Sequence, residues 1–248
     1  MDYVEQSHWD DGYRKIEFAT ASDRVTRWIR RHVPSVAPGT VSTAFEIGCF
    51  PGRYLSYIGT LGFELSGCDV TPRTAELAQW LTRQGRKVGA VVNADATSLA
   101  PSPVHDLVYS IGFIEHFEDY RGIVAAHDRL LIPGGTLLIA CPNFRGAVQN
   151  FLHRSFDKRN LALHNVEAMD PSEWAKVLEP MGYVVEFSGF FGGFDFWTDD
   201  GLERPSTARK AAAFPFKVMG RALQWVPNSP AWSPYAGLVA RKPALPAG

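Results

Sequence analysis

Two histidines stand where an imidazole ring could take part in proton transfer. His116 lies in the run GFIEHFEDY, and His164 lies in the run LHN beside Asn165. Imidazole titrates near neutral pH, so either ring could act as a general base toward a hydroxyl group. Glu115 is expected to fix its loop rather than to react. The other histidines have no comparable context: His8, His32, His105, His127 and His153. His116 and His164 are therefore the candidate catalytic residues.

A glycine-containing run, TAFEIGCFPGRYL from Thr43 to Leu55, could form one wall of a nucleotide site. Its first half is apolar and predicts a buried parallel strand, and Gly48 permits a tight turn into a helix. Pro51 is expected at the first helical position, and Gly52 is expected to leave the backbone bare beside a ligand. The free N–H groups of the helix would face the crevice where open α/β sheets bind nucleotides.

Acidic residues follow the next two predicted strands. Asp69 ends the strand expected at 63–68, about 20 residues after the glycine turn, where a carboxylate can accept both ribose hydroxyls. Thr71 is expected to cap the following helix, with Pro72 at the first helical position. Asp95 follows the strand expected at 87–92. Both carboxylates are thus predicted at the carboxyl edge of one sheet.

These motifs resemble those of the class I S-adenosylmethionine (SAM) methyltransferases. The family's first motif reads acidic–x–Gly–x–Gly–x–Gly, which Glu46, Gly48 and Gly52 match, whereas Phe50 replaces the middle glycine. The resemblance implies that SAM is the cofactor, that Asp69 holds its ribose and that Asp95 meets the adenine amino group. It implies further cofactor contacts from residues beside these motifs: Cys49, Val70, Ala96 and Ile111. No metal site is expected from the sequence.

The run GFIEHFEDY resembles the segment GxxEHxxD that follows the fourth strand in many small-molecule methyltransferases. The family also favours an N-terminal lid over SAM, with Trp9 and Tyr13 as candidate contacts. Packing alone explains these two aromatic residues equally well.

The resemblance implies an α/β fold with a Rossmann-like, seven-stranded sheet in the order 3-2-1-4-5-7-6. It covers Ala44 to Phe187 and a final strand. The later strands are expected at 105–111, within 130–141, at 183–187 and at 235–241, the last one antiparallel. Helices are expected at 22–32, at 119–131 and from 171 to 181, the last of these capped by Asp170.

The whole chain, 1–248, is expected to form one methyltransferase domain. Residues 1–40 would be the lid, 41–141 the SAM-binding half and 142–248 the acceptor-binding half. Residues 142–169 show no clear period, and a segment this long without a period is more often functional than connective. The acceptor pocket is therefore expected there.

Composition favours a cytoplasmic protein with reduced thiols. The net charge is −1, and all three cysteines (Cys49, Cys68 and Cys141) lie in or beside predicted core strands. Neither a signal peptide nor an apolar run of membrane-spanning length is evident. A small-molecule or sugar acceptor is expected, and nucleic acid is not. The chain is expected to be a monomer or a homodimer.

The charge is unevenly distributed, because residues 204–248 carry seven basic and no acidic side chains. These are interleaved with apolar residues and suggest an amphipathic stretch. Such a stretch suits a membrane surface, an anionic or lipid-linked acceptor, or a dimer interface. A solvated helix face explains it most simply.

Three function classes remain open from the sequence. The first is a SAM-dependent methyltransferase that acts on a hydroxyl of a small molecule or sugar, with an amine acceptor as the alternative. The second is a dinucleotide oxidoreductase, which the missing third glycine of the motif disfavours. The third is a catalytically silent protein of the SAM-binding fold, which only Phe50 supports.

Overall fold

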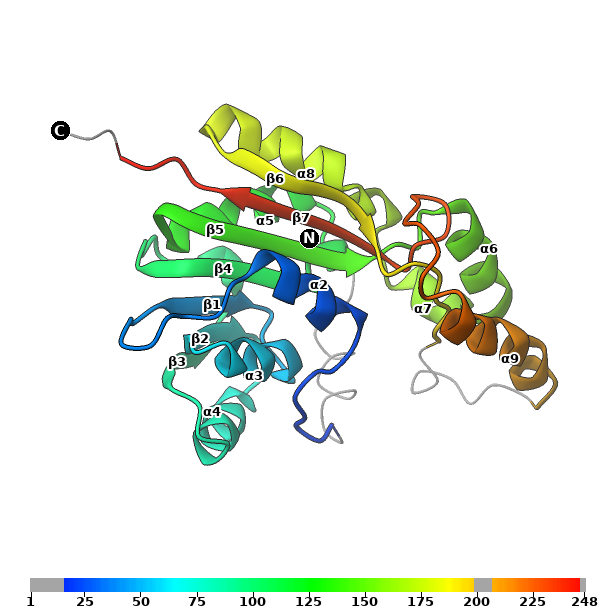
Figure 1. The fold of residues 1–248 in the computed structure, drawn as a ribbon, viewed down its shortest axis with the longest axis horizontal. Helices are drawn as coiled ribbons and strands as arrows, with labels where there is room; N and C mark the ends of the chain where they lie inside the picture. Colours follow the sequence, from blue (N-terminus) through cyan, green and yellow to red (C-terminus); the bar gives the residue numbers. More distant parts are fainter. Residues whose placement is uncertain (1–15, 199–206, 246–248) are drawn as a thin grey trace.

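Seven strands form one mixed sheet in the order β3-β2-β1-β4-β5-β7-β6 (Figure 1). The computed structural model describes residues 16–198 and 207–245. The strands are β1 (Thr43–Ile47), β2 (Glu64–Asp69), β3 (Val88–Asn93), β4 (His105–Ile111), β5 (Leu131–Pro142), β6 (Val184–Phe191) and β7 (Tyr235–Arg241). Strand β7 runs antiparallel to both of its neighbours. The predicted fold class and strand order are confirmed.

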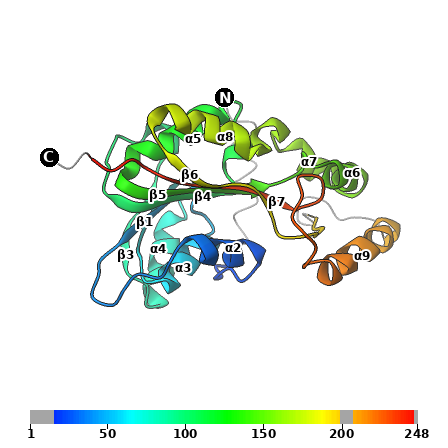
Figure 2. The same ribbon diagram turned by 45° about the horizontal axis from the view of Figure 1, so that its top comes forward.

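Helices cover both faces of the sheet (Figure 2). One face carries α2 (Arg24–His32), α3 (Arg53–Thr60) and α4 (Thr74–Arg83), and the other carries α5 (Tyr120–Ala126) and α8 (Pro171–Leu178). The remaining helices lie beyond the end of the sheet toward which β5 points: α6 (Ala147–Phe156), α7 (Lys158–Ala162) and α9 (Thr207–Ala222). Short 3-10 turns complete the fold: η1 (Ala96–Ser98), η2 (Ile114–His116), η3 (His127–Leu130), η4 (Val166–Met169) and η5 (Glu179–Met181).

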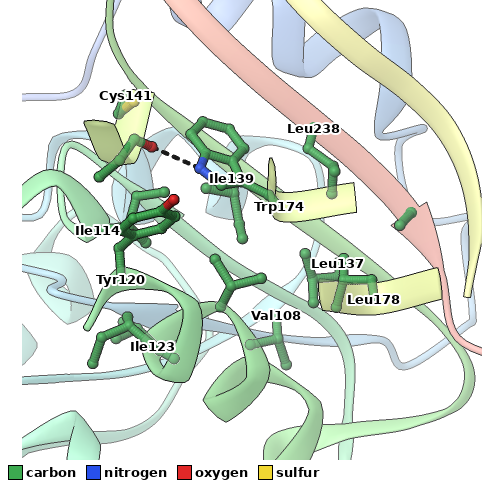
Figure 3. Close-up of a cluster of buried hydrophobic side chains, with 14 of the residues drawn as sticks. Val108, Ile114, Tyr120, Ile123, Leu137, Ile139, Cys141, Trp174, Leu178 and Leu238 are labelled. Carbon is green, nitrogen blue, oxygen red and sulfur yellow. Dashed lines mark hydrogen bonds between the residues drawn. The ribbon is translucent and has the colours of Figure 1, made fainter. Parts of the chain in front are cut away.

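Helix α8 closes the core on the second face (Figure 3). Its predicted cap is confirmed, because the Asp170 side chain accepts the backbone N–H of Ser172. Trp174 is fully buried, and its indole N–H donates to the carbonyl of Ala168 at 2.7 Å. Such a side chain stabilises the fold by about 1.5–3 kcal/mol through burial, and it needs a partner for its one polar atom.

Two predicted helix starts are wrong. Helix α3 begins at Arg53, with Gly52 as its N-cap at φ 80°, and Pro51 lies in the preceding turn after a cis peptide bond. Only glycine takes this left-handed conformation at low cost, so the turn extends through Gly52. Helix α4 begins at Thr74 rather than Pro72, and the Thr71 hydroxyl accepts the backbone N–H of Arg73 within the turn.

The expected irregular segment at 142–169 is largely helical. It contains α6, α7 and η4. Its apolar period is obscured because α6 buries Gln149 and His153 beside Leu152. The predicted helix at 119–131 is also divided, since α5 ends at Ala126 and η3 follows.

All three cysteines are buried free thiols, as expected. Among the described residues, every helix is too short or too polar to cross a lipid bilayer. The division into lid, SAM-binding half and acceptor-binding half remains a prediction.

Candidate active site

Asp69 holds the turn between β1 and α3 against the end of β2. The backbone N–H of Phe50 donates to Oδ2 of Asp69, and the N–H of Thr71 donates to Oδ1, each at 3.1 Å. The carboxylate is buried, and burial raises its pKa although the backbone N–H groups of Phe50, Thr71 and Val70 act in the opposite direction. An ionised carboxylate has about four acceptor positions. The Asp69 carboxylate can therefore still accept a further donor.

Glu46 contacts the same turn from the interior of the protein. Its buried carboxylate accepts the Tyr109 hydroxyl at 3.2 Å. Burial raises the pKa of Glu46 well above its ordinary value, while hydrogen bonds from Tyr109 and the Leu55 backbone oppose the shift. These partners place Glu46 between β4 and the first turn of α3, so its observed role is to position the turn.

Phe50, the departure from the family motif, is packed into the protein. Its ring meets Phe18 edge-on at 5.7 Å, and the Arg73 guanidinium lies 5.3 Å from its centre. Gly52 does not face open space, because a side chain there would grow into Leu77. The expectation that the Gly52 backbone lies bare beside a ligand stays a prediction, since only the direction of an added Cβ is filled by Leu77.

The other predicted cofactor residues gather at the carboxyl ends of β1 to β4. Cys49 is buried in the first turn, Val70 is partly exposed after β2, and Ile111 ends β4. Asp95 caps η1 by accepting the backbone N–H of Thr97 at 2.8 Å, next to buried Ala96. Trp9 and Tyr13 lie outside the described residues.

His116 and His164, the two candidate catalytic residues, lie together. Their ring centres are 4.8 Å apart, and Nε2 of His116 is 4.0 Å from Oε1 of Glu115. One ligand-forming atom from each of Glu115, His116 and His164 lies within 4.8 Å of the others. We call these three residues the Glu–His–His cluster.

Backbone hydrogen bonds hold the two halves of the Glu–His–His cluster together. The N–H of Asn165 donates to the carbonyl of Glu115 at 2.7 Å, and the Asn165 side chain donates to the carbonyl of Phe117 at 3.0 Å. Ile114, drawn in Figure 3, anchors η2 in the core. Sequence reasoning placed Asn165 beside His164 but missed this joining role, which no local pattern signals.

The two imidazoles form the same kind of hydrogen bond through the same ring nitrogen. Nδ1 of His116 lies 3.2 Å from the carbonyl oxygen of Leu163, and Nδ1 of His164 lies 2.6 Å from that of Asn160. A carbonyl only accepts, so each Nδ1 carries the proton. The lone pair of each neutral ring is then on Nε2.

Burial controls the charge of the Glu–His–His cluster. It raises the pKa of Glu115 to about 8 and lowers the pKa of His164 to about 4. His164 is therefore neutral at physiological pH and is a weak base. His153 also lies close by: its ring centre is 3.9 Å from that of Phe144 with the two rings tilted by 39°, and Phe144 in turn contacts His164. No motif in the sequence marks Phe144 or His153 as part of the site.

Phe113 joins the Glu–His–His cluster to the first turn. A Cβ added to Gly48 would lie 2.3 Å from Cδ2 of Phe113, so this ring lies directly against the turn. The two predicted parts of the site, the glycine turn and the histidine pair, therefore adjoin one another. Phe113 belongs to the GFIEHFEDY run but was not singled out from the sequence.

Part of the chain matches a known protein family. The model of a family described as "Methyltransferase domain" matches residues 45–139, which run from β1 into β5. This region is a methyltransferase domain, and the sheet has the strand order of the class I SAM-dependent methyltransferase fold. SAM is accordingly the cofactor of this methyltransferase. The buried carboxylate of Asp69, which can still accept a further donor, fits a hydroxyl group of the ribose.

Two curated relatives of this methyltransferase are named O-methyltransferases. It is 29% identical to O-methyltransferase rstn1 of Aspergillus nomiae over 57% of this chain and 66% of that protein. It is 28% identical to the ubiquinone biosynthesis O-methyltransferase of Thiobacillus denitrificans, over 46% of this chain and 50% of that protein. The chain thus spans less than two thirds of either relative.

Among solved structures, the fold resembles a SAM-dependent methyltransferase from Archaeoglobus fulgidus. The TM-score is 0.57 at 18% identity, and the match covers 88% of this chain and 93% of that one. At this identity the likeness establishes the fold alone.

Proposed function

We propose that this chain transfers the methyl group of SAM to a hydroxyl oxygen of a small molecule or sugar. The observation that carries the proposal is the Glu–His–His cluster, which adjoins the glycine turn through Phe113. The names of the two curated relatives, both O-methyltransferases, support the same acceptor chemistry.

The chain's main contribution is alignment. SAM supplies a methyl group bonded to a positively charged sulfur, which is a good leaving group. Asp69 would hold the ribose by charge-assisted hydrogen bonds, and the backbone around Gly48 would set the depth of the cofactor. Holding donor and acceptor in line removes much of the entropic barrier of a bimolecular reaction.

His116 and His164 would contact the acceptor. In each neutral ring Nε2 is the atom that can accept a hydrogen bond from the acceptor hydroxyl, because Nδ1 donates to a carbonyl. The hypothesis of a histidine base rests more on His116 than on His164, since the low pKa of His164 makes it a poor proton acceptor.

Helix α9 is a proposed partner surface. Phe214 and Trp225 are 63% and 82% exposed, and exposed Lys210 lies on the same helix as Phe214. Exposed aromatic and basic side chains together suit an anionic membrane surface or a lipid-linked acceptor.

Sedimentation with vesicles containing anionic lipid tests whether the chain binds such a surface, with neutral vesicles as the control. Equal recovery with both would contradict it.

The decisive test of the function is turnover. The purified chain is incubated with SAM and with separate panels of phenols, sugars and amines, and S-adenosylhomocysteine and methylated product are measured. Acceptor-dependent product from a hydroxyl compound supports the proposal. Product from amines alone would replace it with N-methylation. SAM binding without turnover on any panel would indicate a silent SAM-binding protein.

A further inference from the structure

We propose that the Glu–His–His cluster is a binding site for a divalent transition-metal ion. The sequence alone predicted no metal site, because Glu115 and His116 lie far from His164 along the chain. The structure brings one ligand-forming atom of each residue to within 4.8 Å of the others. Two imidazoles and one carboxylate form a ligand set typical of Mn²⁺, Fe²⁺, Co²⁺ and Zn²⁺, and Mg²⁺ prefers oxygen ligands.

Glu115 supplies the strongest evidence for a bound cation. Its side chain is 1% exposed, and neither carboxylate oxygen has a hydrogen-bond partner among the described residues. A buried carboxylate without a partner is costly, and such groups in proteins are normally paired or coordinate a metal. His116 Nε2 is 4.0 Å from Oε1 of Glu115, which is beyond hydrogen-bond distance.

The orientation of both histidines is that of metal ligands. A ligating histidine usually donates its other ring N–H to a carbonyl or carboxylate, which fixes the tautomer and the ring direction. His116 donates from Nδ1 to Leu163, and His164 donates from Nδ1 to Asn160. Both rings therefore have Nε2 as the ligating atom in the neutral form.

A bound cation would require the three ligand atoms to move closer together. Nitrogen and oxygen ligands lie roughly 2.0–2.2 Å from such a cation, so neighbouring ligand atoms of a tetrahedral or octahedral site are about 3–3.6 Å apart. Glu115 Oε1 and His116 Nε2 are 4.0 Å apart, and the three ligand-forming atoms lie within 4.8 Å of one another. Side-chain rotation would have to close this difference. The Asn165 hydrogen bond to Glu115 keeps the segment carrying His164 in place while the side chains adjust.

A cation with three protein ligands has further positions for oxygen ligands. Bound there, an acceptor hydroxyl would lose its proton more readily, because the positive charge stabilises the alkoxide or phenolate. This catalytic role rests on the proposed function, whereas binding of the cation does not. With the cation bound, a histidine base would not be required.

Metal binding is tested without SAM and without acceptor. The full chain is treated with a chelator, exchanged into metal-free buffer and titrated with Mn²⁺, with the free ion followed by electron paramagnetic resonance. We expect one saturable ion per chain. Glu115→Gln and His164→Asn should each raise the dissociation constant at least tenfold. His105→Asn is the matched control, since His105 begins β4 at the opposite end and should leave binding unchanged.

Thermal unfolding of each variant in metal-free buffer verifies that it is folded, and His116→Asn replaces any variant that is not. Absence of saturable Mn²⁺ and Zn²⁺ binding by the parent overturns the proposal. So does parental affinity in the folded cluster variants. Saturable binding without methyl transfer would defeat the proposed function and leave the metal site standing.

Discussion

Leu77 of α4 occupies the space into which a side chain at Gly52 would extend. A Cβ built on Gly52 would lie 2.2 Å from Cδ1 of Leu77, and Gly52 has φ +80°. Two separate costs therefore act on any substitution there: backbone strain and overpacking against α4.

We expect Gly52→Ala to lower the free energy of unfolding by roughly 2–4 kcal/mol, as the sum of left-handed strain and overpacking. Gly85→Ala is the matched control, because Gly85 has φ +72° but no atom within 4 Å of the position that its Cβ would take. It should cost only about 1 kcal/mol. Urea unfolding measures the free energy of unfolding of both variants. An equal loss of stability in the two variants would contradict the role of Leu77.

Asp69→Ala should weaken SAM binding by about one to two orders of magnitude. Hydrogen bonds to a charged group contribute roughly 1.5–3 kcal/mol, and a tenfold change in affinity is about 1.4 kcal/mol. Isothermal titration with SAM measures the change. Glu186→Ala, on the far edge strand β6, serves as the control. Parental affinity in a folded Asp69→Ala chain would remove Asp69 from the cofactor site.

His116→Ala should lower turnover by about 10²–10⁴-fold while SAM binding stays near the parental value. His164→Ala should also lower turnover, through the loss of a contact to the acceptor, without a change in SAM binding. The physical reason is that both Nε2 atoms belong to the cluster proposed to contact the acceptor, in either the base or the metal-ligand role. Rates near the parental value in both variants would show that alignment of the acceptor needs neither ring.

Acid should destabilise the fold through His127. This ring is fully buried, with Nδ1 donating to the Ile123 carbonyl and Nε2 accepting from the Ser110 hydroxyl, and burial lowers its pKa to about 4. The unfolded chain takes up a proton near pH 6.5, whereas the folded chain does so only near pH 4. Stability is therefore lost as pH falls between these values.

The His127 contribution should decrease by roughly 2 kcal/mol between pH 7 and pH 5, from the linkage of proton binding to folding. Urea unfolding of the parent and of His127→Gln at both pH values separates the contribution of His127 to the free energy of unfolding from the contributions of the other histidines. An identical pH dependence in the two proteins would contradict it.

The sheet could be predicted from the sequence because its strands are locally distinctive. Strands β4 and β7 were predicted with their observed bounds, since both are apolar runs flanked by turn residues. Helix α6 was missed because Gln149 and His153 are buried in it: the Gln149 amide donates to two backbone carbonyls and His153 lies against Asp157. Polar residues satisfied inside the protein disrupt the period that marks a helix.

For the site, the sequence proposed candidate residues but not their spatial relationships. Asp69 and His116 were selected from motif position, and His164 from its place in the 142–169 segment. That His116 and His164 meet depends on the hydrogen bond from Asn165 to Glu115, which joins distant segments. A hydrogen bond between residues far apart in the sequence leaves no local sequence pattern. For the same reason Phe113, Asn160 and Phe144 were not predicted as parts of the site.

Strands β6 and β7 meet at the point where the chain leaves the sheet. Phe191 at the end of β6 is the register partner of Tyr235 at the start of β7. The segment between them, residues 192–234, thus leaves the sheet and returns to it at one place. The entropy of closing such an excursion grows slowly, by about 0.6 kcal/mol for each doubling of its length. Evolution can therefore lengthen or replace this segment, which includes the proposed partner surface on α9, while the seven strands of the sheet are left unchanged.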